Sequence, residues 1–230
     1  MDVINVISLI LTIMVIAMFG YQFFYILVSL IDEIKTRIQK NNQYKDILNG
    51  VAKAEDFIEK DGEPHRFVFV IAARNEENVI ANLIESIRQQ NYPSDMIDVF
   101  VVADNCTDKT ADVAREAGAV VYERFNDEQV GKSYALNYLF NKINADYGSY
   151  RAYDGYFIFD ADNIVGKDFT RAMNNEFCKG YRVVTGYRNS KNFGTNWITA
   201  GYSIAFMREA KYLNNSRKLL KSSTMVSGTG

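Results

Sequence analysis

Short apolar runs that alternate with helix-like segments after Pro64 constrain the fold of this chain more than any other feature. The runs are Phe67–Ala72, Asp98–Ala103, Val120–Tyr122 and Tyr156–Phe159. The first is almost continuously apolar, which is typical of a strand buried on both faces. Strands that alternate with helices at this spacing predict an α/β fold with a mostly parallel sheet and helices on both faces.

Helix signals occupy the segments between these runs. Thr107 or Asp108 is placed to cap a helix that ends at Gly118. The same reasoning gives helices over residues 75–87, 132–143, 167–178 and 197–220, and a fifth strand over residues 182–185.

Four polar clusters follow predicted strands, at residues 73–76, 104–108, 131–132 and 160–163. Parallel strands end at one rim of their sheet, and ligands bind at that rim in folds of this class. The clusters are therefore expected to converge on one site. A single cluster would suit ordinary helix capping, so the functional interpretation depends on the convergence of all four.

Asp160 and Asp162 are predicted to bind a metal ion. Asp160 follows the apolar run directly, where an unpaired carboxylate is costly. Two neighbouring carboxylates repel each other, and a hard divalent cation removes that repulsion. Mg²⁺ or Mn²⁺ binds through one or two carboxylates together with phosphate oxygens of a substrate. The alternative is that Asp162 caps the next helix while Asp160 forms a turn.

The other clusters offer groups for a nucleotide. Asp104 is placed to accept a hydrogen bond from a base or ribose, and Lys132 to meet a diphosphate at a helix start. Arg74 and Glu76 flank the same region from the first strand. Cys106 has no neighbouring base and is interpreted as a packing residue.

Composition excludes several function classes. The net charge is −2, and the basic residues are spread along the chain, which argues against a nucleic-acid partner. One histidine and two cysteines supply neither a zinc site nor a disulfide framework, and a His-dependent triad is almost excluded. Any catalytic chemistry therefore depends on carboxylates, amides, hydroxyls, lysines or a metal ion bound by oxygen atoms.

Residues 1–31 are predicted to be a transmembrane anchor. The run from Val3 to Ile31 has no charge, and a bilayer-spanning helix needs about 20 apolar residues. A cleavable signal peptide fits worse, because no basic residue precedes the run and the run is too long. The first basic residues follow it, which places the remainder in the cytoplasm: Lys35, Arg37, Lys40 and Lys45. Residues 32–64 are expected to be a helical linker, and residues 65–230 the α/β domain.

Four sequence stretches together resemble the inverting family-2 glycosyltransferases. In order they are Phe-Val-Ile-Ala-Ala-Arg-Asn-Glu-Glu from Phe69, Val-Val-Ala-Asp-Asn-Cys-Thr-Asp-Lys-Thr from Val101, Gly-Lys-Ser-Tyr-Ala-Leu-Asn from Gly131 and Phe-Asp-Ala-Asp from Phe159. The likeness covers roughly residues 67–230. With the N-terminal run, it extends to the membrane-bound branch that includes cellulose, chitin and hyaluronan synthases.

The resemblance implies a GT-A fold and a nucleotide-sugar donor, favouring a UDP-sugar. By it, Ala72, Glu76 and Asp104 hold uracil and ribose. Asp160 and Asp162 place the diphosphate through Mn²⁺ or Mg²⁺, and Lys132 lies near the phosphates or sugar. A terminal loop cups the donor sugar and the end of a glycan or lipid-linked acceptor: Ser227, Gly228, Thr229 and Gly230.

The sequence departs from the family pattern in two places. Val130 stands where many relatives have arginine before Gly131-Lys132. The Glu-Asp pair that supplies the general base in relatives, and the Gln-x-x-Arg-Trp motif, do not occur before Gly230. We therefore expect a C-terminally truncated enzyme whose base lies beyond Gly230. The alternative is a catalytically inactive donor-binding module. A nucleotidyltransferase has little support, because no glycine-rich loop follows the first strand.

Overall fold

A computed structural model describes residues 2–57, 61–148, 152–190, 193–224 and 226. Contacts between residues divide them into two compact units. One unit holds the described residues of 1–60 and 186–226, and the other holds those of 61–185. Each unit is described separately.

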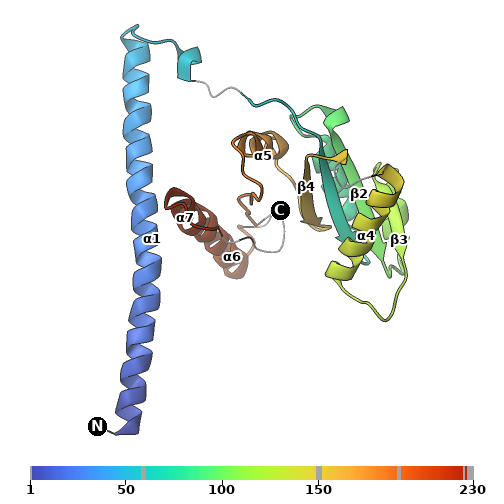
Figure 1. The fold of residues 1–230 in the computed structure, drawn as a ribbon, viewed down its shortest axis with the longest axis horizontal. Coiled ribbons are helices and arrows are strands. Elements are labelled where there is room, and N and C mark those ends of the chain that lie inside the picture. The colour runs from blue at the N-terminus through green and yellow to red at the C-terminus, as the bar shows by residue number, and fades with distance from the viewer. Residues whose placement is uncertain (1, 58–60, 149–151, 191–192, 225, 227–230) are drawn as a thin grey trace. The chain divides into compact units, whose positions relative to one another are not determined.

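The unit of residues 61–185 is built on a four-stranded sheet (Figure 1). Its strands are β1 (Phe67–Ala73), β2 (Ile97–Asp104), β3 (Val120–Arg124) and β4 (Gly155–Asp160). They lie in the order β3-β2-β1-β4, and every neighbouring pair is parallel. The parallel sheet predicted from the sequence is therefore confirmed.

Helices cover both faces of this sheet because β1 is apolar on both sides. Phe69 and Ile71 point into a core shared with α2 (Ile80–Arg88), α3 (Thr110–Glu116) and the start of α5 (Phe169–Cys178). Val68 and Val70 point into a second core against α4 (Lys132–Tyr147). All four side chains are fully buried. The α/β class with flanking helices is confirmed.

The predicted strand over residues 182–185 is wrong. These residues are not paired with a strand of the sheet, and Val183 is 69% exposed. A short apolar run forms a strand only when a neighbour shares its backbone hydrogen bonds, and the pattern of side chains cannot show whether such a neighbour exists. Short 3₁₀ turns lie at Ala54–Phe57 and Ser94–Met96.

The unit of residues 1–60 and 186–226 is helical. α1 (Val3–Leu48) runs past Ile31 without a break, so it includes the first half of the predicted linker. The predicted helical stretch from Trp197 is confirmed as α6 (Trp197–Met207), the π-helical η4 (Arg208–Asn214) and α7 (Asn215–Leu219). η4 and α7 pack against α1, and the Ser29 hydroxyl donates to the Lys211 carbonyl at 2.8 Å.

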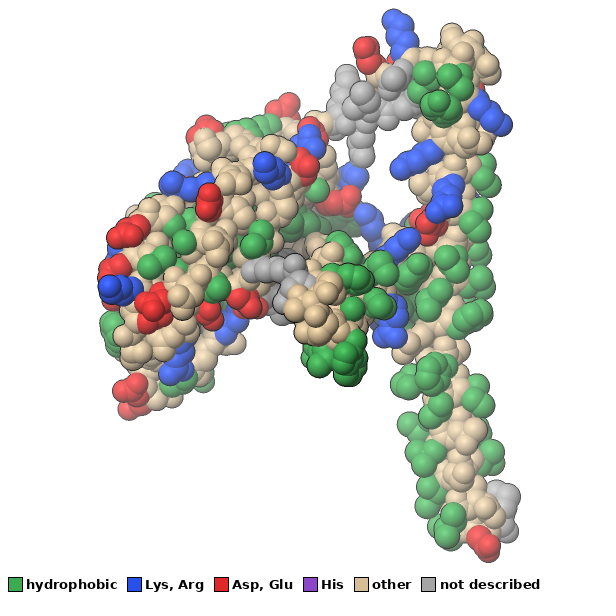
Figure 2. Space-filling model, turned by 180° about the vertical axis from the view of Figure 1, so that it is seen from behind, with side chains coloured by type: hydrophobic (Ala, Val, Ile, Leu, Met, Phe, Trp, Pro, Cys, Tyr) green, Lys and Arg blue, Asp and Glu red, His purple; other side chains and the backbone are tan. Residues whose placement is uncertain are grey.

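α1 is the one helix among the described residues that is long and apolar enough to cross a membrane, judged by length and composition. Hydrophobic side chains cover its N-terminal part, and charged side chains gather along its C-terminal part (Figure 2). Signal sequences meet the same criteria, so this is a weak indication of a membrane span.

Candidate functional site

The carboxyl ends of β1, β2 and β4 meet at one rim of the sheet. In the parallel register Ala73 lies beside Ala103 and Ala72 beside Asp160. From β1 the chain continues to β2, which is the neighbour of β1 on one side, whereas β4 is its neighbour on the opposite side. A sheet whose connections diverge in this way has a crevice at the point of divergence.

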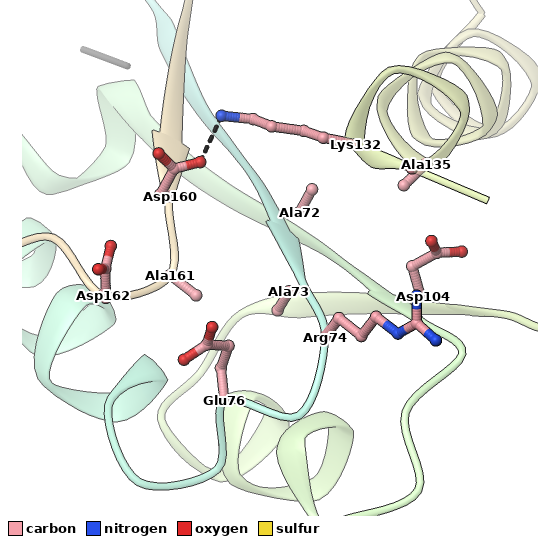
Figure 3. Close-up of a pocket in the computed structure, with 11 residues that line it drawn as sticks. Ala72, Ala73, Arg74, Glu76, Asp104, Lys132, Ala135, Asp160, Ala161 and Asp162 are labelled. Carbon is pink, nitrogen blue, oxygen red and sulfur yellow. Dashed lines mark hydrogen bonds and ion pairs between the residues drawn. The ribbon is translucent and has the colours of Figure 1, made fainter. Parts of the chain in front are cut away.

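A cavity of about 340 Å³ occupies this crevice (Figure 3). Alanine side chains and a glycine form part of its wall, which leaves space for a ligand to approach the backbone. Charged side chains of both signs form the rest. The lining comprises Ala72, Ala73, Arg74, Glu76, Asp104, Gly131, Lys132, Ala135, Asp160, Ala161 and Asp162.

Lys132 and Asp160 form an ion pair across the cavity, joining the start of α4 to the end of β4 (Figure 3). Both side chains are partly exposed, at 36% and 44%. Gly131, the residue before α4, has φ of 131°, a conformation that favours glycine. The glycine therefore allows α4 to begin with its lysine at the rim.

Asp104 is held by a residue that the sequence reasoning missed. The Arg124 guanidinium donates to the Asp104 carboxylate at 2.5 Å, and both side chains are at least nine-tenths buried. Arg124 also donates to the carbonyl of Gln129 at 2.7 Å, in the loop before α4. Asp104 and Arg124 are direct partners in the β2–β3 register. The sequence shows each residue at the end of an apolar run, but only the pairing of β2 with β3 brings the two together.

The loops after β1 and β2 are fastened to each other. Asn75 and Asn105 both adopt positive φ, at 56° and 50°, which asparagine tolerates better than most residues. The Asn75 side chain accepts a hydrogen bond from the Thr107 N–H at 2.8 Å. The Glu76 N–H donates to the Thr110 hydroxyl, also at 2.8 Å. Two of the predicted polar clusters thus form one hydrogen-bonded structure.

Asp108 is the acceptor at the centre of these loops. It accepts from the N–H groups of Glu77 and Thr110 and from the Thr110 hydroxyl, at 3.2, 3.0 and 2.5 Å. Partial burial alone would raise the pKa of Asp108, but these hydrogen bonds outweigh it and lower the pKa. Burial raises the pKa of the nearby Cys106 thiol, which agrees with its interpretation as a packing residue.

The carboxylates at the end of β4 fit a metal ion that takes part of its coordination from a ligand. No group of three or more His, Cys, Asp or Glu side chains with metal-site geometry occurs within the described residues. Asp160 and Asp162 both line the cavity, and Asp162 also accepts from the Asn163 amide at 2.8 Å. Mg²⁺ and Mn²⁺ need only one or two carboxylates where phosphate oxygens and water complete the shell.

The structure brings every predicted site residue of the sheet rim to this one cavity: Ala72, Arg74, Glu76, Asp104, Lys132, Asp160 and Asp162. Their roles toward a donor or metal stay predictions. Residues 227–230, predicted to form the donor and acceptor loop, lie outside the described residues.

The strands and helices of the α/β unit fall within a family match. A family model described as glycosyltransferase-like family 2 matches residues 64–230. The chain belongs to this family. The match contains all four strands and the cavity at their carboxyl ends, so the site is a feature of the family-2 region of the chain.

Curated relatives include glycosyltransferases of Staphylococcus aureus. The 4,4'-diaponeurosporenoate glycosyltransferase of strain MRSA252 is 38% identical over 131 residues, which is 54% of this chain and 32% of the relative. The protein of the same name from strain USA300 is 46% identical over 69 residues, 29% of this chain and 18% of the relative. The chain therefore spans about a third or less of these relatives.

Solved structures with a similar fold include TarS 1-349 of S. aureus in complex with UDP, at 19% identity and a TM-score of 0.37, covering 47% of this chain and 30% of that one. The mannosyltransferase PcManGT from Pyrobaculum calidifontis, in complex with GDP-Man and Mn²⁺, has 21% identity and a TM-score of 0.40, with 66% and 44% coverage. The assignment to glycosyltransferase-like family 2 depends on the family match.

Proposed function

We propose that this chain is the donor-binding part of a membrane-anchored glycosyltransferase. It transfers a sugar from a nucleotide-sugar, of the UDP type, to a hydroxyl group with inversion, in the synthesis of a glycan or polysaccharide. The observation that supports this function is the rim cavity, which is lined by the carboxylates of Asp160 and Asp162 at the end of β4 and by Lys132 at the start of α4, with Lys132 paired to Asp160. The family match over residues 64–230 supports the reaction class.

The two ends of the cavity suit the two ends of a nucleoside diphosphate. Asp104, fixed by Arg124, is an acceptor for donors on the base or ribose, and Ala72 leaves room beside it. Lys132 is a point charge for the phosphates. Asp160 and Asp162 would hold Mn²⁺ or Mg²⁺, which would supply positive charge to neutralise the diphosphate.

The acceptor is a glycan or a lipid-linked molecule, and α1 holds the enzyme at the membrane with its α/β domain in the cytoplasm. The uncharged run of α1 and the basic residues after it support this orientation. Transfer to the acceptor hydroxyl also needs a general base that takes up its proton.

Metal-dependent donor binding tests the proposal. Purified chain is titrated with UDP by calorimetry, with Mn²⁺ or Mg²⁺ and again with a chelator. We expect binding that needs the metal, and an affinity at least about tenfold lower in Asp162→Asn. Asp112→Asn is the matched control, because Asp112 lies on α3, is 70% exposed and does not line the cavity. Metal-independent UDP binding, unchanged in Asp162→Asn, would contradict the proposed metal site.

Turnover separates the transferase from the alternative, a donor-binding module without activity. The same protein is incubated with UDP-sugars, and release of UDP is measured in wild type and in Asp162→Asn. Release that Asp162→Asn abolishes supports the transferase. Metal-dependent binding without release supports the donor-binding module.

A further inference from the structure

α6 is an apolar helix with an exposed surface. None of its 11 residues is charged, and Trp197, Tyr202 and Ile204 are 84%, 62% and 55% exposed within the described part of the chain. A helix of this length rises about 16 Å, roughly half of the hydrocarbon thickness of a bilayer. α6 is therefore too short to span a membrane and too exposed to be a core helix. An exposed apolar segment of this length is suited to contact with the membrane interface.

The helical segment after α6 is fastened to α1 where the uncharged run of α1 ends. The Ser216 hydroxyl donates to the Tyr25 carbonyl at 2.5 Å, and Lys211 forms an ion pair with Glu33 at 3.0 Å. Tyr25 and Glu33 lie on either side of Ile31, the last residue of the uncharged run. A span of about 20 residues that begins near Val3 reaches the headgroup region near Tyr25. η4 and α7 therefore contact the part of α1 that is expected at the membrane surface.

The charges next to α6 suit an anionic membrane surface. The segment from Arg208 to Lys221 contains five basic residues and one acidic residue: Arg208, Lys211, Arg217, Lys218 and Lys221 against Glu209. Apolar side chains bound at the acyl boundary and basic side chains among anionic headgroups are the two contributions that hold interfacial helices.

We propose that α6 contacts the membrane at its surface, with its apolar side chains at the acyl boundary and the basic residues of 208–221 among anionic lipid headgroups. The proposal rests on the proposed insertion of α1 and goes beyond it by assigning a second membrane contact. The membrane contact of α6 does not depend on donor binding by the rim cavity. An experiment that contradicts donor binding therefore leaves the membrane contact standing, and the reverse also holds.

Trp197 makes this proposal testable, because it is the single tryptophan of the chain. The full chain is reconstituted in vesicles of phosphatidylcholine alone or mixed with phosphatidylglycerol, and its emission is quenched with brominated lipid or with aqueous acrylamide. We expect brominated lipid to reduce the emission about twofold, more strongly with phosphatidylglycerol, and acrylamide to quench weakly. Resistance to alkaline carbonate extraction reports insertion of α1 in the same samples.

Three outcomes would overturn the proposal. Strong acrylamide quenching in carbonate-resistant samples would show that α6 is in water although α1 is inserted. Weak quenching by both agents would show that protein, rather than lipid, covers α6. Loss of the chain on carbonate extraction would show that α1 itself is not inserted, and the proposed anchor would fail together with the contact of α6.

A pair of substitutions controls for general effects of added charge. Ile204→Glu places a carboxylate on α6 and is expected to reduce quenching of Trp197 by brominated lipid severalfold. Val183→Glu makes another exposed apolar residue acidic, in the α/β unit, and is expected to leave quenching unchanged. Equal quenching in the wild type and in Ile204→Glu would contradict a lipid contact of α6.

Discussion

The buried ion pair between Asp104 and Arg124 is the most sensitive pair of residues in the site. Removing one partner from such a pair leaves an uncompensated charge, which costs about 3–5 kcal/mol. We therefore expect Arg124→Ala to raise amide exchange rates in β2 and β3 and to abolish UDP binding, measured by hydrogen-exchange mass spectrometry and calorimetry. Arg115→Ala is the control, because its ion pairs with Asp112 and Glu123 are exposed and worth up to about 1 kcal/mol. Equal effects of the two substitutions would contradict the special role of Arg124.

The ion pair between Lys132 and Asp160 contributes less to stability than the buried pair, because water screens it. A pair this exposed contributes roughly 0–1 kcal/mol, so Lys132→Met should fold normally. The substitution removes a competitor for the Asp160 carboxylate and a cation for phosphate. We expect Mn²⁺ alone to bind more tightly and UDP to bind more weakly, measured by electron paramagnetic resonance and calorimetry. Lys167→Met, at an exposed lysine outside the cavity lining, should change neither. Unchanged UDP affinity in Lys132→Met would rule out its proposed phosphate contact.

At the scale of elements, Asp108 connects the loops after β1 and β2. Its lowered pKa means that the folded state favours the carboxylate. This stabilisation is complete above the ordinary aspartate pKa of about 3.9, and it is lost as the pH falls through the lower pKa of the folded state. We expect Asp108→Ala to speed amide exchange of Glu77 and Thr110 at pH 7, whereas wild-type protection persists at pH 5. Asp112→Ala, in the first turn of α3, should leave both amides protected.

The sequence predicted the four strands and their shared rim because both depend on local patterns. Buried parallel strands have continuous apolar runs, and polar residues after them lie at one edge whatever the strand order. Arg124 was missed because its partner is 20 positions away and only the strand register reveals it. The strand over residues 182–185 was wrong for the same reason, since pairing depends on a neighbour that the segment does not encode.

At the scale of the whole molecule, the proposed membrane insertion of α1 can be tested by adding a charge, because the free-energy cost of a buried charge is known. A charged side chain at the centre of a spanning helix costs about 2.5–3.5 kcal/mol in insertion experiments. Val15→Arg, near the middle of the uncharged run, should therefore shift part of the chain into the alkaline-extractable fraction of expressing cells. Ile38→Arg adds the same side chain beyond the run and should remain in the membrane fraction. Equal extraction of the two variants would argue against a span over residues 3–31.

The orientation of the molecule can be read from its own cysteines. Cys178 is exposed, whereas burial raises the pKa of Cys106 and slows its reaction with maleimides. If the residues after α1 face the cytoplasm, a membrane-impermeant maleimide added to intact cells should leave Cys178 unlabelled, and permeabilised cells should give strong labelling. Cys178→Ser should lose that labelling, which assigns the signal. Labelling of Cys178 in intact cells would place the α/β unit outside the cytoplasm, away from a cytoplasmic supply of nucleotide-sugar donor.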